Sequence, residues 1–104
     1  MDDVSFLKEI EEGLEEVSNA RKVVGEWSFE ITVPTIEETL LVKIKALVDS
    51  DGRYWAYPNI LVNNYLAEGR ATQLPEIAVS ESLFLLINEL KMRNNPKIEP
   101  NELY

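Results

Sequence analysis

The sequence predicts an α+β fold, in which a three-stranded antiparallel β-meander carries an N-terminal and a C-terminal helix packed on one face. Two observations lead to this prediction. Apolar residues recur with helical spacing near both ends of the chain, whereas between residues 27 and 57 they alternate with polar residues. An Asp51-Gly52 pair, typical of tight hairpin turns, separates two of the alternating segments. A sheet with one apolar face needs helices to cover it.

Residues 3–23 are predicted to form an amphipathic helix. Its apolar residues follow the spacing that lines one helix face: Phe6, Leu7, Ile10, Leu14 and Val17. Asp2 and Asp3 suit the positive end of the helix dipole, where they can also cap the first turn. Arg21 and Lys22 suit the negative end, and Gly25 is expected to end the helix.

Three strands are expected after this helix, over residues 27–33, 41–48 and 53–57. Apolar and polar residues alternate in each of them, as they do in a half-buried strand. A loop over residues 34–39 joins the first two strands, and the Asp51-Gly52 turn joins the last two.

The lengths of these two connections predict the register. A two-residue turn pairs Val48 with Trp55, and the loop pairs Ile31 with Val42. Both registers place one set of apolar side chains on a single, helix-covered face: Trp27, Phe29, Ile31, Val42, Ile44, Ala46, Val48, Trp55 and Tyr57. Tyr54 is then expected on the opposite, outer face.

The segment 59–79 has two interpretations. Residues 59–68 form a short helix with Gly69 as its C-cap, or the segment contains an edge strand that begins at residues 60–62. Ser80 is predicted to be the N-cap of the last helix, which ends near residues 94–96. We therefore expect a single domain over residues 1–95 and a disordered tail over residues 96–104.

The composition restricts the chemistry that the protein can perform. The chain has 19 acidic and 10 basic residues, a net charge of −9, and neither Cys nor His. Nucleic acid and anionic membranes are disfavoured as direct partners, because both are bound through basic surfaces. Without Cys or His, thiol and imidazole catalysis, Ser-His-Asp triads and the usual zinc and haem ligands are excluded. We expect no cofactor.

The segment Asp49-Ser50-Asp51-Gly52 begins like a calcium-binding loop. Such a loop needs oxygen ligands at positions 1, 3 and 5 and a glutamate at position 12. Counting from Asp49, position 5 is Arg53 and position 12 is Ile60, so the ligand set is incomplete. The sequence therefore predicts a hairpin turn and no metal site.

The location of the protein is also predicted from the sequence. The first residues lack the positive charge of a secretory signal, and the longest apolar run, residues 83–87, is far shorter than a membrane span. We expect a soluble, cytoplasmic protein.

Two features are candidate partner-binding sites. Glu9, Glu12 and Glu16 belong to a group of five glutamates on the first predicted helix, where like charges at i, i+4 repel one another. This helix face is either a solvated surface or a docking face for a basic protein. Tyr54 is the second candidate, because the predicted outer face is half apolar. That face is a contact surface unless the segment 59–68 folds over it.

Two segments carry a resemblance to a known family. Residues 42–45 (Val-Lys-Ile-Lys) and 51–60 (Asp-Gly-Arg-Tyr-Trp-Ala-Tyr-Pro-Asn-Ile) resemble the start of HicB-type antitoxins. In that family a strand, an Asp-Gly hairpin and a Tyr-containing strand ending in Pro open a partial RNase H-like fold. The forty residues ahead of Leu41 have no counterpart in the family. No functional residue is carried over from it.

Together, these observations predict a non-enzymatic, acidic protein-protein interaction module of the inhibitor, immunity or antitoxin kind, which binds a basic protein surface. One alternative is a small ligand-binding or carboxylate-based enzymatic domain. Another is a structural subunit that assembles through the outer sheet face or an open strand edge, for example as a homodimer. An enzyme should have a concave pocket with converging carboxylates, whereas an interaction module should have an open surface patch.

Overall fold

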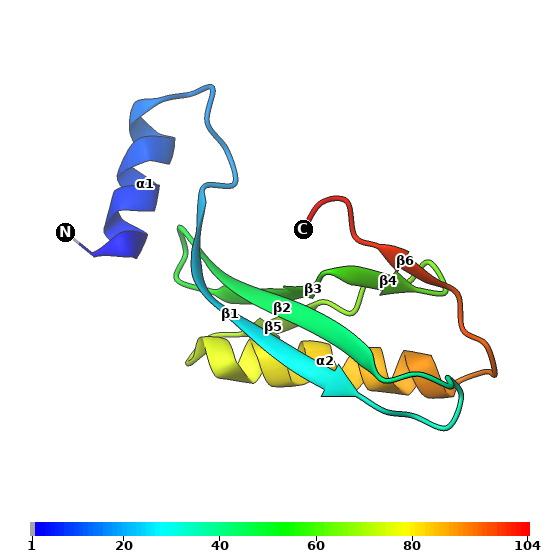
Figure 1. Cartoon of the computed structure of the whole chain (residues 1–104). Coiled ribbons are helices and arrows are strands. Elements are labelled where there is room, and N and C mark those ends of the chain that lie inside the picture. The colour runs from blue at the N-terminus through cyan, green and yellow to red at the C-terminus, as the bar shows by residue number, and fades with distance from the viewer. Residues whose placement is uncertain (1) are drawn as a thin grey trace.

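A computed structural model describes residues 2–104, so that Met1, the first residue of the predicted domain, lies outside the described residues. Figure 1 shows the elements, which are α1 (Asp3–Gly13), β1 (Arg21–Ile31), β2 (Leu40–Asp49), β3 (Tyr54–Pro58), β4 (Ile60–Val62), β5 (Gly69–Ala71), α2 (Pro75–Lys91) and β6 (Ile98–Pro100). The main sheet is antiparallel with strand order β1-β2-β3-β5, and β4 pairs with β6 in a second, two-stranded sheet. This arrangement confirms the α+β fold with two helices and an antiparallel sheet.

Helix α2 covers one face of the main sheet, which we call the inner face. The helix packs against β2, β3 and β5 and makes few contacts with β1. Leu86 and Leu90 of α2 are fully buried, in one cluster with the inward side chains of β2, which include Val42, Ile44 and Ala46. The core of the molecule therefore lies between α2 and the three strands above it.

Helix α1 is shorter than predicted and does not lie across the inner face. It ends at Gly13, and the chain enters β1 at Arg21. The physical reason is local: glycine has a low helix propensity, and the two glutamates before it oppose the negative end of the helix dipole. Figure 1 shows α1 beyond the end of the sheet, near the hairpin of β2 and β3. Among residues 3–13 only Leu7 is buried.

The first hairpin differs from the predicted register by two residues, because the connection spans residues 32–39. Trp27 pairs with Ile44, and Phe29 pairs with Val42. A shift of two residues leaves every side chain on its predicted face. Trp27 is therefore confirmed on the inner face, where it is half-buried against the core.

Gly25 lies at a bulge in β1 and not at the end of a helix. The register of β1 and β2 shifts between Val23 and Gly25. A Cβ atom at Gly25 would lie 2.6 Å from the ring of Trp27. The glycine therefore leaves room for the indole, which packs along its own strand.

The second hairpin differs from the predicted register by one residue, and this shift reverses the faces of β3. The loop has three residues, 50–52, and is closed by a hydrogen bond from the Asp49 N–H to the Arg53 carbonyl (3.0 Å). Gly52 adopts a φ of +79°, the left-handed conformation that three-residue hairpin loops require at this position. Ala46 therefore pairs with Ala56, and the predicted inward positions of Trp55 and Tyr57 are wrong.

The segment 59–79 contains two short strands, β4 and β5. The interpretation in which a strand begins at residues 60–62 is therefore confirmed. A helix over 59–68 does not form, because Asn63 and Asn64 adopt left-handed φ angles of 52° and 63° and turn the chain. Helix α2 begins at Pro75 and not at Ser80. Proline suits the first helical position, since the N–H that it lacks has no partner there.

The residues predicted to form a disordered tail form strand β6 and a further turn. The backbone of Lys97 makes two hydrogen bonds with Asn63. The Asn63 N–H donates to the Lys97 carbonyl, and the Lys97 N–H donates to the Asn63 side-chain oxygen at 2.9 Å. The Asn101 amide donates to the Pro58 carbonyl at 3.0 Å. These partners lie far away in the sequence, so the local pattern of residues 96–104 gives no sign of them.

Candidate interaction surface

The outer face of the main sheet carries an indole ring flanked by two arginines. The centroid of the Trp55 ring lies 5.4 Å from Arg21 Cζ and 4.9 Å from Arg70 Cζ. Trp55 stands on β3, Arg21 on β1 and Arg70 on β5, so the three side chains span the sheet. Guanidinium groups at this distance are attracted to the indole by cation–π interactions. We call Arg21, Trp55 and Arg70 the Trp55 cluster.

The carboxylate of Asp49 holds the Trp55 ring and the adjoining loop in place. Its Oδ2 accepts a hydrogen bond from Trp55 Nε1 at 2.8 Å, and its Oδ1 accepts from the N–H groups of Asp51 and Arg53, each at 2.9 Å. Partial burial raises the pKa of Asp49, but these hydrogen bonds outweigh it, so the pKa lies below its usual value. Asp49 is therefore a positioning residue for the Trp55 cluster.

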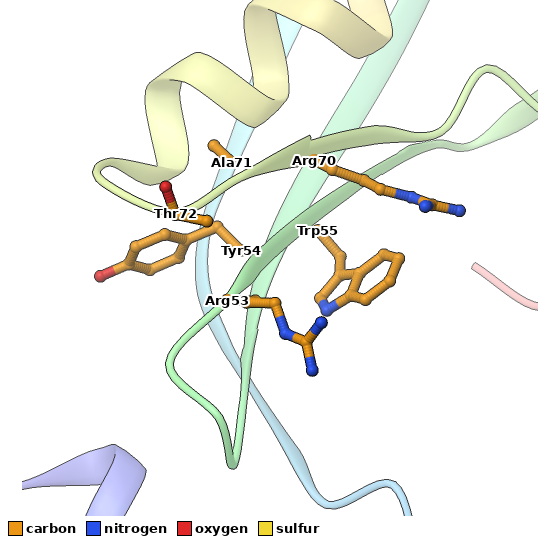
Figure 2. A pocket seen from close by; sticks show the side chains of 6 residues that line it. All are labelled: Arg53, Tyr54, Trp55, Arg70, Ala71 and Thr72. Carbon is orange, nitrogen blue, oxygen red and sulfur yellow. The ribbon is translucent and has the colours of Figure 1, made fainter.

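A shallow pocket of about 320 Å³ borders the Trp55 cluster; it is lined by Arg53, Tyr54, Trp55, Arg70, Ala71 and Thr72. Figure 2 shows that the Tyr54 and Trp55 rings point in different directions from neighbouring positions of β3. A larger groove of about 610 Å³ extends from Arg21 and Trp55 past the hairpin loop to Glu11 of α1. The Trp55 cluster and α1 therefore border one continuous surface.

Helix α1 is attached to this surface by polar contacts. The Glu11 carboxylate accepts from the Ala20 N–H at 3.0 Å, and its hydrogen bonds with Ser50 and Ala20 hold its pKa below the usual value. Lys22 Nζ pairs with the Asp3 carboxylate at 2.9 Å. The contacts with Ala20 and Lys22 join α1 to the start of β1, and the contact with Ser50 joins it to the tip of the hairpin.

The three glutamates predicted to bind a partner are all exposed. Glu9 and Glu12 lie on α1, and Glu16 lies in the turn that follows it. The predicted like-charge pair Glu12–Glu16 is therefore not on one helix face, because the helix ends before Glu16. No ion pair within residues 2–104 includes any of the three. Phe6 of the same helix is also exposed, with a relative exposure of 54%.

Tyr54, the fourth predicted binding residue, is not on the outer face. The one-residue shift of the second hairpin turns it inward, where it packs against the buried core. It pairs with Val48, whose side chain is also buried. The outer position that Tyr54 was expected to hold belongs to its neighbour Trp55.

The C-terminal residues border the outer face on its other side. Lys45 Nζ lies 4.4 Å from the centroid of the Tyr104 ring. The Tyr104 hydroxyl donates a hydrogen bond to Glu26, and burial, followed by this bond, raises the pKa of Tyr104 above its usual value. A groove of about 350 Å³ lies between this segment and the Tyr57 side of the sheet.

The carboxylates near the larger groove have structural partners. Asp49 accepts three hydrogen bonds, Glu11 accepts from Ala20, and Asp51 pairs with Arg53 at 2.8 Å. In the described part of the chain, no three acidic, His or Cys side chains are grouped so that they could hold a metal ion. None of the helices in residues 2–104 has the length and apolar character needed to cross a membrane.

The sequence does not predict the Trp55 cluster, because the cluster requires Trp55 on the outer face of the sheet and the predicted register places Trp55 on the inner face. The signal was present in Asp49-Ser50-Asp51-Gly52, where an aspartate and a glycine at i and i+3 are typical of a type I turn followed by a left-handed residue. The segments that resemble HicB-type antitoxins lie mostly in the hairpin of β2 and β3, which ends at Pro58. Comparisons with family models, with curated proteins and with solved structures found no match for this chain.

Proposed function

We propose that the protein is a non-enzymatic interaction module, which binds a basic region of a partner protein through the acidic side chains of α1 and an aromatic or acidic region of the same partner through the Trp55 cluster. The observation that carries this proposal is the Trp55 cluster itself, an indole and two guanidinium groups on a sheet face that α2 leaves open. Trp and Arg are the residues most enriched among those that dominate binding energy in protein interfaces. The cluster supplies the anchor of the interface.

The basic character of the partner is inferred from α1. Glu9, Glu12 and Glu16 are exposed at one border of the surface, and the chain as a whole has a net charge of −9. Such charges steer a cationic surface toward the protein and fix its orientation, while the buried centre of the interface holds it. The two parts of the surface therefore predict separate kinetic effects.

The first test replaces Glu9, Glu12 and Glu16 with Gln in the full chain. A partner captured from the source cell with the wild-type protein is purified, and its association is followed by surface plasmon resonance at low and high salt. We expect association at low salt to slow by about fivefold to tenfold, because the steering charges are lost. At high salt the difference should disappear, since exposed charges are then screened.

A matched control carries the same change in net charge elsewhere. Glu37, Glu38 and Glu81 are exposed on the loop before β2 and on α2, and Gln at these three positions should leave association close to that of the wild type. Equal slowing in both variants would assign the effect to net charge and contradict a role for α1. Both variants should unfold at the wild-type urea concentration.

The second test replaces Arg70 with Ala, which removes one arginine from the Trp55 cluster. Arg70 is exposed, and within residues 2–104 its contacts are an ion pair with Glu68 at 2.8 Å and the cation–π contact with Trp55, so folding should be little affected. We expect the dissociation rate to rise about tenfold with little change in association, as for an anchor residue. Arg93→Ala, an exposed arginine beyond the end of α2, is the control. An unchanged dissociation rate for Arg70→Ala would contradict the proposed anchor.

A further inference from the structure

The groove between the C-terminal segment and the outer face of the main sheet combines two cationic side chains with an apolar lining. We propose that it binds a small organic acid, a monocarboxylate with an aromatic or aliphatic body. The groove has a volume of about 350 Å³, and Figure 1 shows the C-terminal segment on the side of the sheet opposite α2. We call it the Lys45 groove; the side chains that line it include Arg21, Lys45, Leu47, Tyr57, Leu66 and Leu103. The proposal does not rest on the binding of a partner protein.

The two cations of the Lys45 groove come from different strands and meet beside Tyr57. Lys45 on β2 pairs with Tyr57 on β3, so that their side chains are neighbours on the outer face. Arg21 reaches from β1 across β2 and donates a hydrogen bond to the Tyr57 hydroxyl at 3.2 Å. None of the ion pairs within residues 2–104 includes Arg21 or Lys45. Their contacts with the Trp55 and Tyr104 rings position the two charges but do not neutralise them.

Two carboxylates near the groove have other partners, and they restrict the charge of the ligand. Glu68 also lines the groove, but it pairs with Arg70 at 2.8 Å. Glu26 lies opposite Lys45 in the pairing of β1 with β2, and it accepts a hydrogen bond from the Tyr104 hydroxyl. Their negative charges oppose a second negative charge on a ligand. The groove therefore favours a monoanion over a phosphate group, which carries a charge of about −1.5 to −2 at neutral pH.

The apolar lining favours a ligand with an apolar body. Leu47 and Leu66 are half-exposed, and Leu103 has a relative exposure of 93%. An apolar group in the groove would remove part of this surface from water, while its carboxylate accepts charge-assisted hydrogen bonds from Arg21 and Lys45. The volume of the groove lies at the small end of the range for small-molecule pockets. A compact acid therefore suits it better than a segment of polypeptide.

Titration of the isotope-labelled full chain with phenylacetate, followed by NMR, tests the ligand class. We expect saturable changes in the amide signals of Lys45, Leu47 and Tyr57, with a dissociation constant of about 1 mM or lower. Phenylacetamide lacks the charge and acetate lacks the apolar body, so each should bind at least about tenfold more weakly. Inorganic phosphate should also bind more weakly than phenylacetate.

Three results of this titration would overturn the proposal. The first is the absence of saturable changes with phenylacetate. The second is equal binding of phenylacetate and phenylacetamide, since the two cations would then have no role. The third is tighter binding of inorganic phosphate or of the acetylated peptide Gly-Gly-Phe, which would assign the groove to a phosphate group or to a chain terminus in place of a small organic acid.

Two lysine variants locate the site. Lys45→Gln removes one cation of the groove and should raise the dissociation constant for phenylacetate about tenfold. Lys43→Gln is the matched control, because Lys43 is exposed two residues away on the same face of β2 and does not line the groove. Its constant should stay within about twofold of the wild type, and both variants should keep the wild-type urea midpoint. Equal constants for the two variants would overturn the proposal, since phenylacetate would then bind elsewhere, for example at the Trp55 cluster.

Discussion

Replacing Gly69 with Ala is expected to lower the free energy of unfolding by about 3 kcal/mol or more. Gly69 begins β5 at the place where this strand rests on α2, and it is buried. A Cβ atom there would lie 1.8 Å from the Ala78 carbonyl oxygen and 2.8 Å from the backbone N of Ser82. Both neighbours are backbone atoms of a helix, so neither can rotate away. The strand and the helix must separate.

This separation would also weaken the polar contact next to it. The Ser82 hydroxyl donates a hydrogen bond of 2.6 Å to the Ala67 carbonyl, and Ser82 is fully buried. A buried group that loses its partner pays the full cost of desolvation. Urea denaturation followed by tryptophan fluorescence gives the measurement. Gly13→Ala is the control, because nothing lies within 4 Å of a Cβ atom there, and its stability should be unchanged or slightly raised. A loss below about 1 kcal/mol for Gly69→Ala would show that β5 moves freely from α2.

Replacing Asp49 with Asn is expected to lower the free energy of unfolding by about 2–3 kcal/mol at neutral pH. Asparagine has nearly the same shape, but it carries no charge and presents an amide N–H₂ in place of one carboxylate oxygen. If its oxygen still accepts from Asp51 and Arg53, its amide faces the Trp55 Nε1–H, which is another donor. One of the three hydrogen bonds of Asp49 is then lost and the other two are weakened, because neutral acceptors bind less strongly than charged ones.

The difference between wild type and Asp49→Asn should depend on pH. The pKa of Asp49 is lower in the folded protein than in the unfolded chain, so its contribution is complete above the unfolded pKa of about 4. It is lost as the pH falls through the folded pKa. Urea midpoints measured from neutral pH downward should therefore converge at the acidic end. A difference that stays constant with pH would show that the ionised carboxylate is not what stabilises the loop.

The two tryptophans show how far the sequence predicts this fold. Trp27 was predicted on the correct face although its strand pairs two residues away from the predicted register, because an even shift preserves the faces. Trp55 was predicted on the wrong face, since a loop of three residues instead of two shifts the register by one. Alternation within a strand identifies the strand but cannot identify which alternate set faces the core. That choice depends on the conformation of a single residue, Gly52.

The candidate binding residues divide in a similar way. Exposure of Glu9, Glu12 and Glu16 follows from their charge, and the structure places all three at the surface. The Trp55 cluster joins side chains from β1, β3 and β5, and the chain between Arg21 and Arg70 must fold completely before they meet. The same holds for β6, whose partner β4 precedes α2. The periodicity of apolar residues carries information about one helix or strand at a time. It therefore cannot predict contacts between residues that are far apart in the sequence.

The small apolar contact of α1 has a consequence for cooperativity. Only one side chain of the helix is buried, and the polar contacts that attach the helix are hydrogen bonds and an ion pair near the surface. Segments with so little buried apolar area open at a much lower free energy than the core to which they are attached. The unfolding of the helix is thus a separate equilibrium from the unfolding of the sheet. A partner that binds α1 only while the helix is folded against the sheet must also suppress this local unfolding. The stability of the helix therefore contributes to the affinity, and helix residues that do not contact the partner can change that affinity.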